Sequence, residues 1–195
     1  MWGVVSGSVG GGMGGSRHSC EGAGEGGSGE KQAMIKEATA TVFVFRQSED
    51  AGWRVAMMWH PRFAGWIPPG GHVEADESPA EAAVREVVEE LGCRTRLVAG
   101  PATPLPDGFP HTPVVAPWWI VEMAASPDSH TRERHVHVDH VFVALWDGDV
   151  QPPETRVHWF DEQELADGAD IAEDSRLQAK ELFARISEVE ELTHS

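Results

Sequence analysis

Several segments of the chain carry the side-chain pattern of β-strands. Residues 38–45 and 135–145 are rich in β-branched and aromatic side chains, and the second segment alternates between polar and apolar positions at its start. We expect residues 38–45 to lie inside a sheet. Shorter segments of the same kind, each bounded by turn residues, are found at residues 53–60, 94–99, 114–123 and 156–160. Residues 147–149, Asp-Gly-Asp, are expected to form a turn.

A short helix is predicted between Pro79 and Leu91. Ser78 is a typical N-cap, Pro79 suits the first helical position, and Glu81 completes a capping box. Gly92 can adopt the left-handed conformation that ends a helix. A second helix is predicted over residues 175–192, where apolar side chains form one stripe: Leu177, Leu182, Phe183, Ile186 and Val189.

The first of these helices has an acidic face. At about 100° per residue, Glu89 and Glu90 lie roughly 60° and 40° to either side of Glu86. Like charges at these spacings repel by about 0.2–0.5 kcal/mol per pair, and Arg85 is the cation beside them. A solvated face is the ordinary interpretation of such a run, but hard oxygen ligands on one face also suit Mg²⁺ or Mn²⁺. The packing face is expected on the opposite side, with Val84, Val87, Val88 and Leu91.

Composition divides the chain into two parts. Residues 1–33 hold most of the glycines, and such a segment buries too little apolar surface to offset the entropy of ordering it. We therefore expect residues 1–33 to be a disordered tail and residues 34–195 to form one domain. The 195-residue chain has a formal net charge of −17, which disfavours nucleic acid and anionic membrane surfaces as partners.

The two cysteines, Cys20 and Cys93, suggest no disulfide framework and fit a reducing cytosol. No apolar segment approaches the roughly 20 residues of a membrane span, and the first residues lack the pattern of a signal peptide. A cytoplasmic location is therefore expected. Homodimer formation is left open.

The acidic helix belongs to a longer motif. Residues 71–93 read GHVEADESPAEAAVREVVEELGC, with Gly71, Glu77, Arg85-Glu86, Glu89-Glu90 and Gly92 at fixed spacing. This stretch closely resembles the box G-x5-E-x7-R-E-U-x-E-E-x-G-U of the Nudix (MutT-like) hydrolase family. Cys93 stands where that family usually has an aliphatic residue, and cysteine packs as a small hydrophobe.

The resemblance implies a fold and a metal site. The fold expected is α/β, an α/β/α sandwich around a mixed sheet. Glu86, Glu89 and Glu90 match the metal-ligating carboxylates, and the carbonyl of Gly70 inherits a ligand role from the W-x-x-P-G-G segment. Arg85 matches the arginine that orients the first glutamate. Gly71, Glu77 and Gly92 support the loop and helix.

The general base is less determined. Some family members use a box glutamate, here Glu86, and others use a glutamate on a distant loop. Glu133 is our choice because its loop leads into the polar strand at residues 135–140. Glu122 and Glu154 are alternatives.

Several further side chains are candidates for contact with substrate: His72, His135, His137 and Trp66. His135, His137 and Asp139 share one strand face and could hold a transition metal. Successive residues on such a face lie about 6.6 Å apart, so we expect cleft-lining or hydrogen-bonding roles instead.

The resemblance implies an Mg²⁺-dependent pyrophosphohydrolase that cleaves a nucleoside diphosphate linked to another group. A nucleotide-sensing module without turnover is the first alternative, although the complete carboxylate set disfavours it. A diphosphate isomerase on the same fold is the second. That chemistry needs a cysteine in the cleft, whereas Cys93 lies at the helix end and Cys20 lies in the tail.

Overall fold

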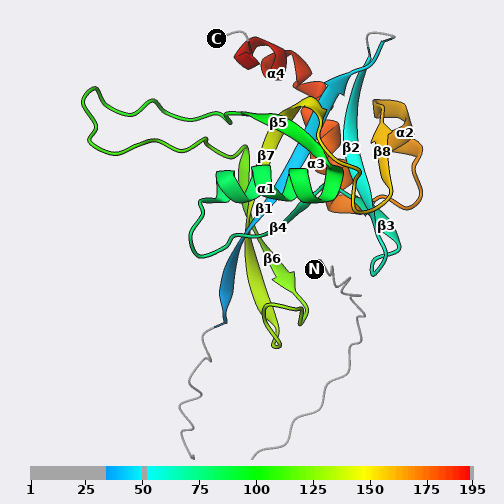
Figure 1. Ribbon diagram of the computed structural model, residues 1–195, viewed down its shortest axis with the longest axis horizontal. Coiled ribbons are helices and arrows are strands. Elements are labelled where there is room, and N and C mark those ends of the chain that lie inside the picture. The colour runs from blue at the N-terminus through cyan, green and yellow to red at the C-terminus, as the bar shows by residue number, and fades with distance from the viewer. Residues whose placement is uncertain (1–33, 50–51, 194–195) are drawn as a thin grey trace, which may run out of the picture.

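The computed structural model describes residues 34–49 and 52–193, and these form a mixed sheet with helices on both faces (Figure 1). The strands are β1 (Lys36–Gln47), β2 (Trp53–His60), β3 (Gly65–Ile67), β4 (Gly70–His72), β5 (Cys93–Val98), β6 (Trp119–Ala125), β7 (His135–Asp149) and β8 (Val157–Phe160). The helices are α1 (Pro79–Leu91), α2 (Glu162–Asp167), α3 (Glu173–Ala184) and α4 (Ile186–Thr193). The predicted disorder of residues 1–33 lies outside the described residues.

Two long strands form the centre of the sheet. β1 and β7 pair in parallel from Lys36 opposite Val136 to Phe45 opposite Leu145. All other strand pairs are antiparallel: β2 and β4 join β1, β5 and β6 join β7, and β3 and β8 join β2. β4 lies beside the first half of β1, and this places the glycines of the box loop directly against the sheet.

Each face of the sheet carries its own apolar core. On one side, Val42 and Phe142 pack with Ala83 and Val87 of α1. On the other side, Phe43 and Val143 pack with Leu165, Leu182 and Val189 from α2, α3 and α4. Consecutive strand residues point to opposite faces, so this division follows from the alternation along β1 and β7. The predicted α/β/α sandwich around a mixed sheet is confirmed.

The ends of α1 are as predicted. The Ser78 hydroxyl accepts from the Glu81 amide, and the Glu81 carboxylate accepts from the Ser78 amide. Gly92 ends the helix with φ of 70°, and a Cβ there would lie 2.1 Å from the carbonyl oxygen of Gln151. A side chain at position 92 would therefore be excluded by both conformation and contact.

Some elements differ from expectation. Residues 147–149 continue β7 rather than forming a turn, with Gly148 at φ of 105°. The expected terminal helix is divided at Arg185, which caps α3, and Leu177 is 60% exposed instead of packed. Val84 is 37% exposed, because the buried face of α1 is formed by Ala82, Ala83, Val87 and Leu91. Within the described residues, no helix is long and apolar enough to cross a membrane.

The capping box gives a stability prediction. Replacing Ser78 with alanine should lower the free energy of unfolding by about 0.5–2 kcal/mol, because it leaves the Glu81 amide at the helix start without its acceptor. Chemical denaturation at fixed pH measures this change. Ser187→Ala, at an exposed position of α4, is the control and should change the free energy of unfolding much less.

Candidate active site

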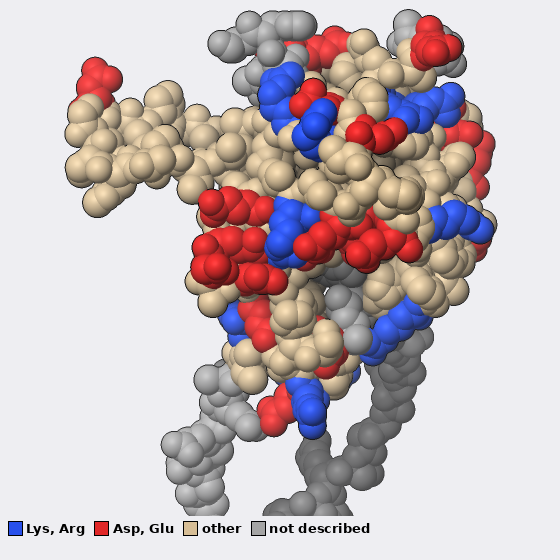
Figure 2. Space-filling model, in the orientation of Figure 1, with Lys and Arg blue, Asp and Glu red and all other residues tan. Residues whose placement is uncertain are grey.

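Acidic side chains gather in a band over α1 and the loop before it (Figure 2). Arg85 lies within this group and binds four acceptors. Its guanidinium donates twice to the Glu77 carboxylate, at 3.1 and 2.6 Å, and also to Glu86 at 2.7 Å and Glu89 at 3.2 Å. It also donates to the main-chain carbonyl of His72 at 3.0 Å. One cation therefore joins the loop, β4 and the acidic face of the helix.

The two glycines of β4 allow the carboxylates of α1 to approach the strand closely. The amide of Gly70 donates to Glu90 Oε2 at 2.9 Å. A Cβ at Gly71 would lie only 2.3 Å from Glu86 Oε1, so a side chain there would displace this carboxylate. A Cβ at Gly70 would lie 2.3 Å from the carbonyl oxygen of Ala40. Position 70 is thus restricted to glycine by main-chain contact, whereas glycine at position 71 leaves room for the Glu86 carboxylate.

The carboxylates of the site have unequal environments. Burial raises the pKa of Glu86, against the opposing effect of Arg85. Burial also raises the pKa of Glu90 to about 8; the Gly70 hydrogen bond lowers it, and the charges of Glu86 and Glu154 add to the rise. The hydrogen bonds from Arg85 hold the pKa of Glu77 below its usual value. Glu77 is therefore a stable anionic partner for Arg85. Glu86 and Glu90, in contrast, have too little positive charge nearby to offset the effect of their burial.

This donor set fits a hard divalent cation. Glu86 and Glu90 are half buried, Glu89 is more exposed, and all three lie along one helix face. Glu86 and Glu89 share a single guanidinium, and Glu90 accepts from the Gly70 amide. A cation at this face would favour the ionised forms of Glu86 and Glu90, which burial alone disfavours. Oxygen-only ligands match Mg²⁺ or Mn²⁺ better than softer metals. Gly70, at the start of β4, is next to these groups.

A cavity of about 440 Å³ lies on the other face of the sheet. Thr41, Asp139 and Met123 form its floor, and the segment from Ala169 to Ser175 forms a wall. Ile67 and Pro68 also line it, and they lead directly into Gly70. Its size suits a small-molecule ligand. Burial raises the pKa of Asp139 to about 6, although its hydrogen bonds with Thr39 and Thr41 lower it.

The three candidate bases lie in different places. Glu133 is exposed on the loop between β6 and β7, where its main-chain carbonyl accepts from His135. Glu122 is exposed on β6 and forms an ion pair with Lys36. Glu154 is exposed in the segment after β7, close enough to influence the pKa of Glu90. Glu133 as the general base stays a prediction.

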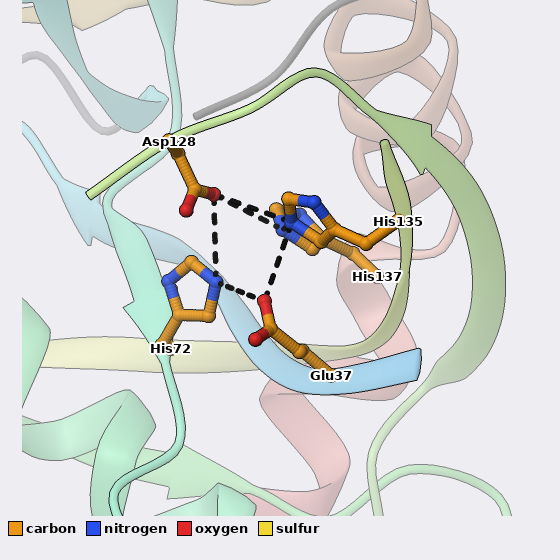
Figure 3. Close-up of side chains that lie close together, drawn as sticks. All are labelled: Glu37, His72, Asp128, His135 and His137. Atoms are coloured by element: carbon orange, nitrogen blue, oxygen red, sulfur yellow. Dashed lines mark hydrogen bonds and ion pairs between the residues drawn. The ribbon is translucent and has the colours of Figure 1, made fainter. Parts of the chain in front are cut away.

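Five side chains converge near the first residues of β1 and β7 (Figure 3). Glu37 comes from β1, His72 from β4, His135 and His137 from β7, and Asp128 from the loop before β7. One ligand atom from each lies within 4.8 Å of all the others. The histidine spacing on β7 indicated part of this cluster, but no local signal pointed to Glu37 or Asp128, which are distant in sequence.

The argument that β-strand spacing separates His135 and His137 was wrong. Their rings lean toward each other, and the two Nε2 atoms lie 2.9 Å apart. Asp139 does not join them, because its carboxylate accepts from the hydroxyls of Thr39 and Thr41. His135 and His137 are each 1% exposed, so they offer almost no surface to a substrate.

The cluster has its own electrostatics. Burial lowers the pKa of His137 to about 4 and also lowers that of His72. Burial would raise the pKa of Asp128, but hydrogen bonds from the Thr131 and His130 amides and the nearby histidines bring it to about 2. At neutral pH, His72 and His137 are therefore neutral and Asp128 is charged.

Trp66 and Cys93 are both packed. The Trp66 ring contacts the rings of Trp59 and Phe160, and the guanidinium of Arg156 lies 4.7 Å from its centroid. Stacking on a substrate base stays an untested role for it. Cys93 is buried at the start of β5, and burial raises the pKa of its thiol to about 11.

Comparison with known proteins gives a family and a similar fold. The family described as NUDIX domain matches residues 36–182. A crystal structure of a hydrolase of the NUDIX family from Clostridium perfringens superposes with a TM-score of 0.58 at 20% identity, over 77% of this chain and 97% of that chain. At 20% identity, this superposition is evidence for the fold alone.

Two curated relatives match a short segment. They are named "m7GpppN-mRNA hydrolase NUDT17", from Xenopus laevis (53% identity over 34 residues) and Danio rerio (59% over 27 residues). The matched segments are 17% and 14% of this chain, and only 12% and 9% of the relatives. Most of each relative's length therefore has no counterpart in the match.

The raised pKa of Glu90 predicts a pH dependence of stability. Without divalent cations, the folded protein keeps a proton on Glu90 up to about pH 8, whereas an unperturbed glutamate titrates near 4.5. The native state then binds more protons than the unfolded state, so the free energy of unfolding should fall as pH rises from about 5 to about 8.

Glu90→Gln should flatten this slope, because the amide is neutral throughout and still accepts from Gly70. Denaturation curves in chelator at several pH values measure it. Glu74→Gln, at an exposed position in the loop before α1, is the control. A slope unchanged by Glu90→Gln would contradict the assignment.

Proposed function

The chain belongs to the Nudix family, and from this premise we propose that it is a hydrolase of diphosphate bonds, which cleaves a nucleoside diphosphate linked to another group with Mg²⁺ held by the box. A nucleoside triphosphate or a related nucleotide is the substrate class. The observation that carries the proposal is the arrangement around Arg85, in which Glu86 and Glu90 are held against Gly70 and Gly71 without enough positive charge.

Glu86, Glu89, Glu90 and the carbonyl of Gly70 are the proposed ligands. A bound Mg²⁺ would neutralise the diphosphate and help to align the attacking water. Mn²⁺ has the same ligand preference and is the alternative ion. The net charge of −17 gives the cation a second purpose, since an anionic substrate would otherwise be repelled.

Arg85 and Glu77 are proposed to position the ligands rather than to touch substrate. The bidentate bond to Glu77 fixes the guanidinium plane, and the same guanidinium holds Glu86 and Glu89. Gly92 ends the helix where the chain must turn into β5. The geometry of the box thus depends on the main-chain turn at Gly92 and on the hydrogen bonds that hold the ligands, as well as on the ligands themselves.

The cavity beside Asp139 is our candidate for the nucleoside end of the substrate. It adjoins the segment that leads into Gly70, and its walls combine apolar groups with carboxylates of Asp139, Glu173 and Asp174. Carboxylates accept from the N–H groups of a base and repel phosphate, so the diphosphate is expected toward the box.

Two alternatives have weaker support. A nucleotide-sensing module without turnover would not need the complete set of Glu86, Glu89 and Glu90. An isomerase would need a reactive cysteine, but Cys93 is buried with a raised pKa. Cys20 lies outside the described residues. A cytoplasmic location stays a prediction, and homodimer formation stays open.

The proposal is tested with a panel of nucleoside triphosphates, dinucleotides, nucleotide sugars and a capped dinucleotide, with products identified by mass. Activity should require Mg²⁺ or Mn²⁺ and disappear in excess chelator. Glu89→Gln should lower kcat by about 10²-fold or more, because it removes a ligand to the charge-stabilising cation.

Glu74→Gln is the matched control, since Glu74 is an exposed carboxylate in the loop before α1, at a position that the box pattern leaves unspecified. In chelator, Glu89→Gln should leave the melting temperature unchanged or slightly higher, because Glu89 is half exposed among like charges. Full turnover in chelator would rule out the mechanism. Tight nucleotide binding without turnover would favour the sensing module.

The base is identified by comparing Glu133→Gln, Glu122→Gln and Glu154→Gln under saturating Mg²⁺. Loss of a general base should lower kcat by about 10²–10⁴ with little change in metal affinity. We predict this result for Glu133→Gln. If Glu154→Gln or Glu122→Gln loses activity instead, the assignment to the loop before β7 is wrong. If all three stay active, Glu86 becomes the candidate.

A further inference from the structure

We propose that Glu37, His72, Asp128, His135 and His137 form a second metal site, which binds a transition-metal dication such as Zn²⁺ and is separate from the carboxylate site on α1. This cluster (Figure 3) is named the histidine site below. It does not rest on the proposed hydrolysis, because none of the metal-ligating carboxylates of the box belongs to it.

The distances between the ligand atoms match a coordination shell. Zinc binds imidazole nitrogen at about 2.0–2.1 Å, so two ligands at a tetrahedral angle lie about 3.3 Å apart. His135 Nε2 lies 2.9 Å from His137 Nε2, 3.2 Å from Glu37 Oε2 and 3.3 Å from Asp128 Oδ2. His72 Nε2 lies 3.2 Å from Glu37 Oε2 and 3.7 Å from Asp128 Oδ2. The five atoms therefore surround a point rather than forming a line.

Other contacts leave these same atoms available for a metal. The Nδ1 atom of His135 is 2.9 Å from the carbonyl oxygen of Glu133, so Nδ1 donates to that carbonyl and Nε2 is the ring nitrogen that faces the other ligand atoms. Asp128 Oδ1 accepts from the amides of His130 and Thr131, while its Oδ2 faces the histidines. The hydroxyl of Thr131 donates to Glu37 Oε1, and Glu37 Oε2 faces inward. Outer partners that fix the ligands in this way are typical of metal sites.

A buried polar atom supports the same conclusion independently. The side chain of Asp128 is 1% exposed, and its Oδ2 has no hydrogen-bond partner among the described residues. Leaving a buried charged oxygen without a partner is costly, and the nearest groups are imidazole nitrogens at 3.3–3.7 Å. A cation between them would bind the oxygen and the nitrogens together.

The ligand types indicate the class of metal. Imidazole nitrogens suit zinc, iron, nickel and copper, whereas magnesium and calcium prefer oxygen ligands alone. Two carboxylates would balance the charge of a dication. The α1 site has the opposite composition, with carboxylate and carbonyl oxygens only. Each site should therefore select a different ion.

The site would tie four parts of the chain together. Asp128 belongs to the loop between β6 and β7, and the other ligands belong to β1, β4 and β7. That loop also carries Arg132 and Arg134, both exposed. A bound ion would hold the loop against the sheet and protect it from trypsin, which cuts after arginine.

The experiment uses the full chain without an affinity tag, stripped with chelator and then titrated with Zn²⁺ or Co²⁺ against a competing chromophoric chelator. One equivalent should bind tightly and persist in excess Mg²⁺. At free Zn²⁺ about 100-fold above Kd, the melting temperature should rise by about 5 °C or more. Tryptic cleavage after Arg132 and Arg134 should slow.

The variants separate the histidine site from other ligands. His135→Ala should weaken Zn²⁺ binding by about 10²-fold or more. Asp128→Asn keeps the shape and the Oδ1 hydrogen bonds, so it tests the metal contact without removing the loop's own contacts. His140→Ala, on the same strand but the opposite face, is the matched control and should keep its zinc. Glu89→Gln should keep it too, because Glu89 belongs to the α1 site.

Three results would overturn the proposal. The first is the absence of binding tighter than micromolar in the unmodified chain. The second is zinc that stays bound in both His135→Ala and Asp128→Asn, since it would then be held by other groups such as His18 and Cys20. The third is zinc that is lost in Glu89→Gln. In each case the cluster would be a hydrogen-bonded network of histidines and carboxylates.

Discussion

The arrangement of the active site depends on the guanidinium of Arg85. Four acceptors from three parts of the chain meet on this one group: the carboxylates of Glu77, Glu86 and Glu89, and the main-chain carbonyl of His72. A lysine could not bind them all, because its ammonium has three donors and no fixed plane. The single positive charge of Arg85 is also too small to balance the carboxylates around it, and this shortage suits the face to a further cation.

The helix of the box and the fold could be predicted from the sequence because their determinants are local. Ser78, Pro79, Glu81 and Gly92 each act within one turn of the helix. The histidine site could not be predicted in full. Residue spacing along β7 measures the distance between Cα atoms, but the two rings turn toward each other across it. Glu37 and Asp128 reach the same point only because β1 pairs with β7 and the loop folds back. The break between α3 and α4 at Arg185 could not be predicted from the apolar pattern either. Apolar residues before and after the break pack into the same core, so the pattern continues across it.

Successive side chains along β7 point to opposite faces of the sheet and therefore contribute to different cores and sites. His135, His137, Asp139 and Val141 lie on the face toward the cavity and α3, whereas Phe142 and Ala144 pack under α1. A shift of one residue in the pairing with β1 would exchange the two sets and destroy both cores and the histidine site. The long parallel register between β1 and β7 therefore fixes the chemistry as well as the packing.

His72 takes part in both sites through different atoms. Its carbonyl accepts from Arg85, and its ring faces Glu37 and Asp128. Every residue type has the carbonyl, but only histidine supplies this ring. Substitution at position 72 can therefore remove one ligand while the acceptor for Arg85 is retained. The two sites are therefore separable, so a change of the side chain at position 72 can weaken the histidine site without rebuilding the catalytic box.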